Sequence, residues 1–387
     1  MTIATSPSLL GGAPARITVD LDAIAANVGV LKQHAGDAQV MAVVKGDAYG
    51  HGLVPSARAA LRGGASWLGV AQMAEAVKLR DAGIEAPVLT WLHAPGLDFG
   101  PAVERGIDIG VPAVWEVEAV AAAARDAGRT ARVQLKVDTG LARNGAYGPD
   151  WTALVETAGK LQAEGVISVT GVFTHFACAD EPRHPSIAAQ QEKFADAVTD
   201  CERAGFDLEV RHMSNSAATL TNPSAAWDMV RPGIAVYGLT PAPNVASSAA
   251  FGLVPAMTVS ANATVTKRVP RGQGVSYSHT YVTPQETTLV DVPCGYADGV
   301  PRHASSCGPV QIGGKRFTVA GRVCMDQFVV DVGDLEVADG EPVVLFGSGA
   351  DGEPTAQDWA DAVGTISYEI VARMSTRLPR LYVGEGA

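Results

Sequence analysis

Residues 39–70, QVMAVVKGDAYGHGLVPSARAALRGGASWLGV, contain one complete strand–helix–strand unit. Gln39–Val44 and Trp67–Val70 are short apolar runs of strand length, and a helix is expected between them at Leu53–Leu61. Parallel strands need a long crossover, which is usually a helix. The stretch therefore predicts a parallel sheet built from strand–helix units.

The same alternation continues on both sides of this unit, as far as Tyr237. Strands are predicted at Gln39–Val44, Trp67–Val70, Pro87–Leu92, Ile107–Val111, Arg132–Val137, Val169–Phe173, Leu208–His212 and Met229–Tyr237. Helices are predicted at Leu21–Ala35, Leu53–Leu61, Met73–Ala82, Trp115–Ala127, Trp151–Ala163 and Ala188–Ala204. This many strand–helix units indicates an α/β fold of the (β/α)8 TIM-barrel type, and a doubly wound open sheet is the alternative. No G-x-G-x-x-G motif follows the first strand, which weakens the dinucleotide-binding form of that alternative.

A different pattern follows the barrel region. Pro241–Ala250 has the composition of a linker, and the β-rich segments beyond it are separated by turns, which predicts a mainly antiparallel β domain. A last helix is predicted at Ser367–Leu378. We expect a barrel domain at residues 14–245 and a mainly β domain at residues 246–387. The strand predicted at Ala15–Val19 can pack with the β domain, so the domains need not be contiguous in sequence.

The composition argues against several classes of protein. With 29 basic and 41 acidic residues the net charge is −12, whereas a nucleic-acid partner usually requires a basic face. The chain has no apolar run near the roughly 20 residues that cross a bilayer, and its N-terminus lacks the pattern of a signal peptide. We therefore expect a cytoplasmic protein with no membrane partner. The cysteines form no C-x-x-C pair, so neither a disulfide framework nor a structural metal site is expected from Cys178, Cys201, Cys294, Cys307 and Cys324.

A lysine closes the first predicted strand of the barrel. Lys45 follows Val43 and Val44 directly, and the carboxyl ends of barrel strands form the active-site face. A partly desolvated lysine has a lowered pKa and can form a Schiff base with a carbonyl compound. The structural alternative is a lysine that extends its ammonium group from the strand end into solvent.

Other predicted strands also end in polar residues that can carry chemistry. Lys136, His175 and Ser216 lie at or just after the ends of the fifth, sixth and seventh strands, and the eighth strand contains Arg231. Each alone has a structural explanation as a surface charge, a core histidine, a helix cap or an ion pair. Their coincidence with Lys45 on one predicted rim favours an active site.

Four segments resemble alanine racemase, a family of barrel-type pyridoxal-phosphate enzymes. They are the Lys45 segment with Tyr49, Lys136–Arg143, Met229–Ile234 and Gly321–Gln327, and the resemblance covers nearly the whole chain. It implies a barrel with a C-terminal mainly β domain, pyridoxal 5'-phosphate as cofactor and a small amino acid as substrate. The implied activity is the interconversion of L-alanine and D-alanine, which supplies D-alanine for peptidoglycan.

The resemblance also implies roles for the residues that bind the cofactor and move protons. Lys45 would hold the cofactor covalently and then act as base or acid on one face of the substrate Cα, and Tyr277 would be the second base. Arg231 would contact the pyridine nitrogen, with His175 behind it. The phosphate group would be bound by Tyr49, Ser216, Gly233, Ile234 and Tyr368.

Further residues are implied at the substrate end of the site. Arg143 would approach the phenolic oxygen of the cofactor and the substrate carboxylate, and Lys136 matches a lysine that is often carbamylated and contacts that arginine. The entrance would be bordered by Tyr296, Met325 and Asp326. In this family Tyr277 and Met325 reach into the site of the other subunit, so a homodimer with shared sites is implied.

The chemistry of racemisation supports these assignments. A proton must leave one face of Cα and return on the other, and two bases on opposite sides of the cofactor do this most simply. A free tyrosine has a pKa of about 10, so Tyr277 needs nearby cations or hydrogen bonds that favour the phenolate. Arg231 can only donate a hydrogen bond, so it suits an unprotonated pyridine nitrogen and predicts little transamination.

Three alternatives remain at this point. A barrel-type amino-acid decarboxylase would use a carboxylate at the pyridine nitrogen and a cysteine as proton donor. A non-catalytic pyridoxal-phosphate-binding protein would consist of the barrel alone, and the β domain beyond residue 250, with Tyr277 and Met325, argues against it. Taken alone, Tyr277 could be an ordinary strand residue. A racemase for serine or for a broad range of amino acids is the third, because one methylene or hydroxyl changes discrimination only modestly in an apolar pocket.

Overall fold

The computed structural model describes residues 12–387, which form two compact units. The barrel unit comprises Ile24–Ala48 and Leu53–Val254. The β unit comprises the described residues up to Ala23, together with Tyr49–Gly52 and Pro255–Ala387. Among the described helices, none has the length and apolar character needed to span a membrane.

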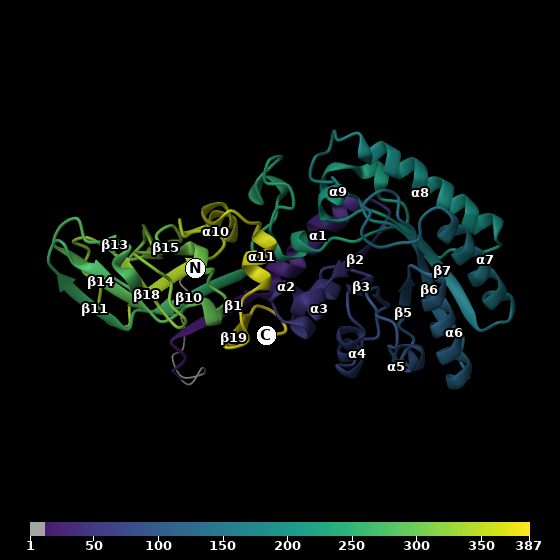
Figure 1. The fold of residues 1–387 in the computed structure, drawn as a ribbon, viewed down its shortest axis with the longest axis horizontal. Helices are drawn as coiled ribbons and strands as arrows, with labels where there is room; N and C mark the ends of the chain where they lie inside the picture. Colours follow the sequence, from purple (N-terminus) through teal and green to yellow (C-terminus); the bar gives the residue numbers. More distant parts are fainter. Residues whose placement is uncertain (1–11) are drawn as a thin grey trace. The chain divides into compact units, whose positions relative to one another are not determined.

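Eight parallel strands form the sheet of the barrel unit (Figure 1). Strands β2 to β8 lie in chain order and β9 lies next to β2. Backbone hydrogen bonds from Asp228 to Arg211 (3.1 Å) and from Arg231 to Ser214 (2.8 Å) also join the β9 segment to the β8 segment. The sheet therefore closes into a barrel, which confirms the predicted fold class and excludes the open sheet. The strands are β2 (Gln39–Val43), β3 (Trp67–Val70), β4 (Val88–Thr90), β5 (Asp108–Val111), β6 (Ala131–Lys136), β7 (Ile167–Phe173), β8 (Val210–His212) and β9 (Met229–Val230).

Helices surround the strands of the barrel unit, as α4 to α8 show in Figure 1. Their apolar faces pack inward at helical spacing; in α8, for example, the buried residues include Ile187, Phe194, Val198 and Cys201. Gly128 ends α6 with a left-handed φ of 61°, and its N–H bonds back to the carbonyl of Ala124. The helices are α1 (Leu21–Ala35), α3 (Leu53–Arg62), α4 (Met73–Asp81), α5 (Gly100–Glu104), α6 (Val114–Ala127), α7 (Pro149–Ala163), α8 (Ser186–Arg203) and α9 (Ser216–Thr221).

Several predicted elements are shorter than expected, and the physical reason is clear for two of them. The strand predicted at Met229–Tyr237 is only β9, because Pro232 has no N–H to donate and a 3-10 turn, Ile234–Tyr237, follows. The helix predicted at Ser367–Leu378 ends at Ala372, since the N–H of Ser375 bonds to the carbonyl of Asp298 instead of continuing the helix.

The N-terminal strand belongs to the largest sheet of the β unit. Strand β1 (Ala15–Asp20) pairs antiparallel with β10 (Met257–Asn262) and parallel with β19 (Arg380–Val383). Its residues alternate between buried and half-buried, as expected for a strand with one face on a core. The sheet continues through β18 (Pro342–Phe346), β15 (Pro309–Ile312) and β16 (Lys315–Thr318).

The rest of the β unit consists of two smaller sheets and two short helices. One sheet contains β11 (Val265–Val269), β14 (Thr287–Val292) and β17 (Phe328–Asp331), and the other contains β12 (Gly274–Val275) and β13 (Tyr281–Val282). The helices are α10 (Ala356–Val363) and α11 (Ser367–Ala372). The unit is mainly β, as predicted.

Candidate active site

Charged and polar side chains gather at the carboxyl end of the barrel strands. Lys45 lies two residues after β2, Lys136 is the last residue of β6, and Arg231 follows β9 directly. His175 and Ser216 follow β7 and β8. Because all strands are parallel, these residues lie on the same rim of the barrel, where enzymes of this fold place their active sites.

Lys45 begins an unusual left-handed turn, labelled α2 (Lys45–Tyr49) in Figure 1. Gly46, Asp47 and Ala48 have φ between 53° and 64°, and Tyr49 has a φ of 53°. The left-handed conformation costs a residue with a side chain roughly 1–2 kcal/mol. Strain of this kind persists where the surrounding structure enforces it, often at functional sites. The turn therefore holds the backbone beside Lys45 in a conformation that the sequence alone would not favour.

Glu75 anchors this turn to α4. Its Oε1 atom accepts a hydrogen bond from the Gly46 N–H at 2.6 Å, and its Oε2 atom accepts bonds from the N–H groups of Ala71 and Gln72 at 3.1 Å each. Burial lowers the pKa of Lys45, and the guanidinium groups of Arg143 and Arg231 lower it further, while Glu75 opposes them. A lysine with a lowered pKa is a better nucleophile at neutral pH.

Lys136 is buried in the same group of cations. Burial lowers its pKa to about 8, with further contributions from Arg231, Arg143 and Lys45. Its Nζ atom lies 5.5 Å from the ring centroid of Phe173. An amine with this pKa is partly neutral near pH 7.5, so it can react as a nucleophile.

Arg231 is a fully buried guanidinium group that contacts neutral acceptors. It donates hydrogen bonds to the carbonyl of Thr174 at 2.6 Å and to Nδ1 of His212 at 3.0 Å, and Nδ1 of His175 lies at 3.4 Å. In the part of the chain that the structure describes, no carboxylate forms an ion pair with it. Burial lowers the pKa of Arg231 to about 9, so it stays charged at neutral pH. Burial and this charge hold the pKa of His175 well below its usual value, so that imidazole is neutral.

The residues predicted to bind a phosphate group are found in two places. In the barrel unit, the hydroxyl oxygen of Ser216 accepts hydrogen bonds from the N–H of Gly233 at 2.8 Å and of Ala235 at 3.3 Å, so Ser216 lies against Gly233 and Ile234. In the β unit, the rings of Tyr49 and Tyr368 lie 6.2 Å apart. Burial and the neighbouring Tyr368 raise the pKa of Tyr49, which keeps its hydroxyl protonated and able to donate.

Arg143 lies in the loop that follows β6. It is exposed in the barrel unit, beside a cavity of about 510 Å³. The loop is folded by Asp138, whose Oδ1 atom accepts three backbone N–H bonds at 2.8–3.2 Å. The cavity is lined by Asp138, Gly140, Ala142, Arg143, Asn144, Gly145, Tyr147 and Lys193.

The β unit brings three of the predicted residues together in one exposed patch. Tyr277, Met325 and Tyr296 have exposed fractions of 68%, 53% and 39%. The hydroxyl of Ser276 donates to the carbonyl of Arg322 at 2.7 Å, and the N–H of Tyr296 donates to the carbonyl of Cys324 at 3.0 Å. We call Tyr277, Tyr296 and Met325 the tyrosine patch.

The backbone around Tyr277 is also strained. Ser276, Ser278 and His279 have φ values of 59°, 61° and 46°. Tyr277 lies in a 3-10 turn rather than in a strand, and its exposure excludes ordinary core packing within the chain. Asp326, adjacent to the patch, is in an ion pair with Arg377 at 2.8 Å.

Sequence reasoning missed the polar residues inside the barrel. Gln134 and His212 are fully buried, and the Nε2 atom of His212 lies 2.7 Å from the Oε1 atom of Gln134. A signal was present, because Arg132, Gln134 and Lys136 alternate along one strand and must share a face. Glu75 was also missed, and its place in a helix gave no such signal.

Two family models match the chain. The model described as alanine racemase, N-terminal domain, matches residues 19–241, and the model described as alanine racemase, C-terminal domain, matches residues 256–382.

Curated relatives and solved structures are similar over nearly the full length. The alanine racemase of Frankia casuarinae is 56% identical over 365 residues, which cover 94% of this chain and 95% of that protein. The alanine racemase of Thermobifida fusca is 54% identical, covering 96% of this chain and 98% of that protein. The solved alanine racemase of Streptomyces coelicolor superposes with a TM-score of 0.95 at 54% identity, covering 96% of this chain and 98% of that one.

Proposed function

The chain belongs to the alanine racemase family, and we propose that Lys45 and Tyr277 are the two proton carriers with which it acts. The family is one of pyridoxal 5'-phosphate-dependent isomerases, so the enzyme interconverts L-alanine and D-alanine with that cofactor. The decarboxylase and the barrel-only binding protein are thereby excluded, and the resemblance in the four segments is confirmed.

The polar groups of the barrel unit fit the cofactor. The hydroxyl of Ser216 and the backbone of Gly233 and Ile234 lie together and suit a phosphate group. The resemblance also gives a phosphate-binding role to the hydroxyl groups of Tyr49 and Tyr368 in the β unit. Arg231 offers hydrogen-bond donors without a carboxylate partner among the described residues, which suits an unprotonated ring nitrogen. Pyridoxal phosphate, when bound, withdraws electrons from the substrate Cα and makes its proton acidic.

Lys45 is suited to two tasks. Its lowered pKa favours the neutral amine, which can bind the cofactor covalently and can accept a proton from Cα. Arg143, on the loop after β6, would hold the substrate carboxylate. Tyr296, Met325 and Asp326 would border the substrate entrance.

Tyr277 would be the second proton carrier, and it would act in the active site of the partner subunit of a homodimer. The observation that carries this proposal is the tyrosine patch, in which Tyr277 is 68% exposed although the strained backbone around it holds it in place. A largely exposed aromatic residue beside a strained backbone is suited to a contact with another chain.

Exchange of the substrate α-proton in D2O tests the two roles separately. The Tyr277→Phe variant should still exchange the α-proton of the enantiomer that Lys45 deprotonates, while exchange of the other enantiomer is lost. Equal loss for both enantiomers would contradict a two-base assignment. Mass spectrometry of recovered alanine, separated by enantiomer, measures both rates.

We also propose that Lys136 is carbamylated. Its pKa of about 8 leaves a fraction of neutral amine that can attack CO2, which forms the N–C bond and releases one proton. The negative carbamate would then lie near Arg143 and Arg231, whose charges favour it. A 13C NMR signal from 13CO2-treated enzyme, absent in Lys136→Met, tests this assignment.

Alanine is the proposed substrate in preference to serine or larger amino acids. A kcat/KM for L-alanine no higher than those for L-serine and larger amino acids would end this proposal. By its family role the enzyme would work in the cytoplasm and supply D-alanine for peptidoglycan, which D-alanine auxotrophy of a deletion strain would test.

A further inference from the structure

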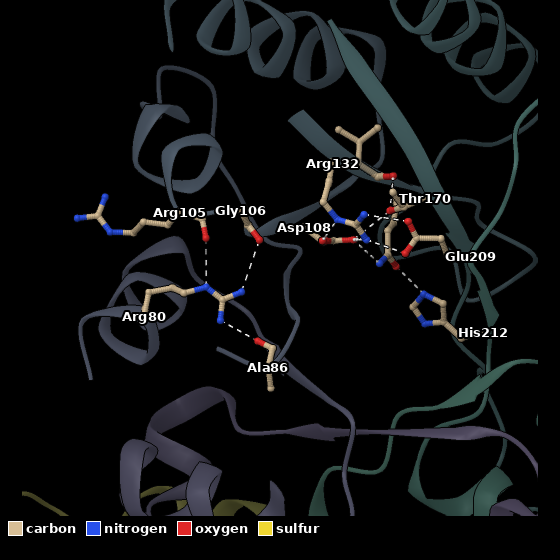
Figure 2. Close-up of polar contacts among 11 residues, drawn as sticks. Arg80, Ala86, Arg105, Gly106, Asp108, Arg132, Thr170, Glu209 and His212 are labelled. Atoms are coloured by element: carbon tan, nitrogen blue, oxygen red, sulfur yellow. Dashed lines mark hydrogen bonds and ion pairs between the residues drawn. The ribbon is translucent and has the colours of Figure 1, made fainter. Parts of the chain in front are cut away.

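A buried carboxylate lies inside the barrel, next to Gln134. Asp108, the first residue of β5, is 1% exposed. It accepts hydrogen bonds from Arg132 Nε at 2.7 Å and from the hydroxyl of Thr170 at 3.0 Å (Figure 2). It also accepts one from Gln134 Nε2 at 3.0 Å. Thr170 reaches it at a bulge, where the register of β6 and β7 shifts. Asp108 is thus held by donors on two strands.

Asp108 leaves the side chain of Gln134 only one orientation. A carboxylate can only accept hydrogen bonds, so the amide nitrogen of Gln134 must face Asp108 and its oxygen must face the other way. That oxygen lies 2.7 Å from Nε2 of His212. An amide oxygen can only accept, so Nε2 of His212 must carry the hydrogen.

The neutral imidazole of His212 then has its lone pair on Nδ1. Burial and the charge of Arg231 hold the pKa of His212 well below its usual value, so the ring carries one hydrogen and not two. Nδ1 lies 3.0 Å from Nη1 of Arg231 and accepts its hydrogen bond. The ring of His212 is stacked on Phe173 at 5.1 Å and 6°, so its plane is fixed as well.

We propose that Asp108 and Gln134 are positioning residues, which fix the hydrogen of His212 on Nε2 and thereby hold the Arg231 guanidinium in the direction that the cofactor ring requires. If His212 carried its hydrogen on Nδ1 instead, that N–H would point at the Arg231 guanidinium, which can only donate hydrogen bonds. Asp108 thus acts on Arg231 through the side chains of Gln134 and His212. The consequence for catalysis rests on the proposed function, but the hydrogen position does not.

The wild-type enzyme tests the hydrogen position without any variant. In holoenzyme labelled with 15N in the histidine rings, long-range 15N–1H correlations distinguish the protonated nitrogen from the one with the lone pair, and His212→Asn assigns the signal. We expect His212 to carry its hydrogen on Nε2 alone. A hydrogen on Nδ1, or on both nitrogens at neutral pH, would overturn the proposal.

Two variants test whether Asp108 and Gln134 act on Arg231. Gln134→Met keeps the length of the side chain and removes both hydrogen bonds, and Asp108→Asn removes the carboxylate. Both should broaden or shift the His212 signals, lower kcat/KM for alanine by about tenfold or more, and raise the pyruvate formed per racemisation turnover. A lower kcat/KM with unchanged His212 signals and unchanged pyruvate would show a structural role only.

Glu209→Gln is the matched control. Glu209 holds the outer side of Arg132 with two hydrogen bonds of 2.8 Å but is half-exposed and does not contact Asp108. The Glu209→Gln variant should leave the His212 signals and the pyruvate fraction unchanged. An effect as large as that of Asp108→Asn would count against the proposal. A failure of the proposed role of Arg231 would give a different result. His212 would then carry its hydrogen on Nε2 as expected, but none of the variants would change the fraction of pyruvate formed.

Discussion

In CO2-free buffer, where Lys136 is an unmodified amine, its replacement by methionine should stabilise the folded protein at neutral pH. Burial and the neighbouring cations lower the pKa of Lys136 from 10.5 to about 8. At about 1.36 kcal/mol for each pKa unit, this corresponds to a destabilisation of roughly 3 kcal/mol when the lysine is charged. Methionine has a similar length and no charge, so Lys136→Met removes the cost and keeps most of the packing.

The pH dependence follows from proton linkage. Between pH 8 and pH 10.5 the unfolded state binds a proton at Lys136 that the folded state has lost, so the stability of the wild type rises with pH in this window. The destabilisation by the charged Lys136 is fully present below pH 8 and disappears as the pH approaches 10.5. The advantage of Lys136→Met should therefore shrink from roughly 3 kcal/mol toward zero across that window.

The free energy of unfolding of the wild type and of Lys136→Met can be measured from pH 7 to pH 10.5. Urea unfolding of the apoenzyme, at fixed protein concentration in CO2-free buffer, provides it. Added bicarbonate should stabilise the wild type alone, because a carbamate removes the positive charge. A stability difference that does not change with pH would refute the assignment of a lowered pKa to Lys136.

Three further predictions concern single residues. Arg231→Glu should lower racemisation and raise transamination, seen as pyruvate release, and unchanged rates for both would show that the role of Arg231 is wrong. Glu75→Gln removes the charge that raises the pKa of Lys45, so the acidic limb of the kcat/KM profile should move to lower pH; a move to higher pH would contradict this. Ala142→Gly replaces an exposed residue at a φ of 56° and should stabilise the protein by about 0.5–1 kcal/mol, since the relief of left-handed strain exceeds the entropy cost of glycine. A lower Tm would speak against that strain.

The barrel and its rim could be predicted because the signals are local. A short apolar run that ends in a polar residue marks both a strand and the side on which it ends, and this placed Lys45, Lys136 and Arg231 at the same rim. The break of the last strand after Val230 was foreseeable from Pro232, which cannot donate to a strand partner.

Other features depend on contacts between distant residues. Asp47 and Ala48 have no intrinsic preference for the left-handed turn, which forms where Glu75 binds Gly46, 29 positions along the chain. Gln134 and His212 are 78 positions apart, and only the closed barrel brings them together. The exposure of Tyr277 likewise depends on the packing of the whole β unit.

Recovery of activity in mixed dimers tests the central claim most directly, namely that Tyr277 serves the Lys45 of the partner subunit. Lys45→Ala and Tyr277→Phe subunits, each inactive alone, would be mixed in equal amounts, dissociated and reassociated with added pyridoxal phosphate, with each variant treated alone as the control. If the site is shared, half of the dimers are mixed and each contains one intact site, so about a quarter of wild-type activity should return. If the mixture stays at the residual activity of its parents although mixed dimers have formed, both residues serve the same chain's site and the claim is contradicted.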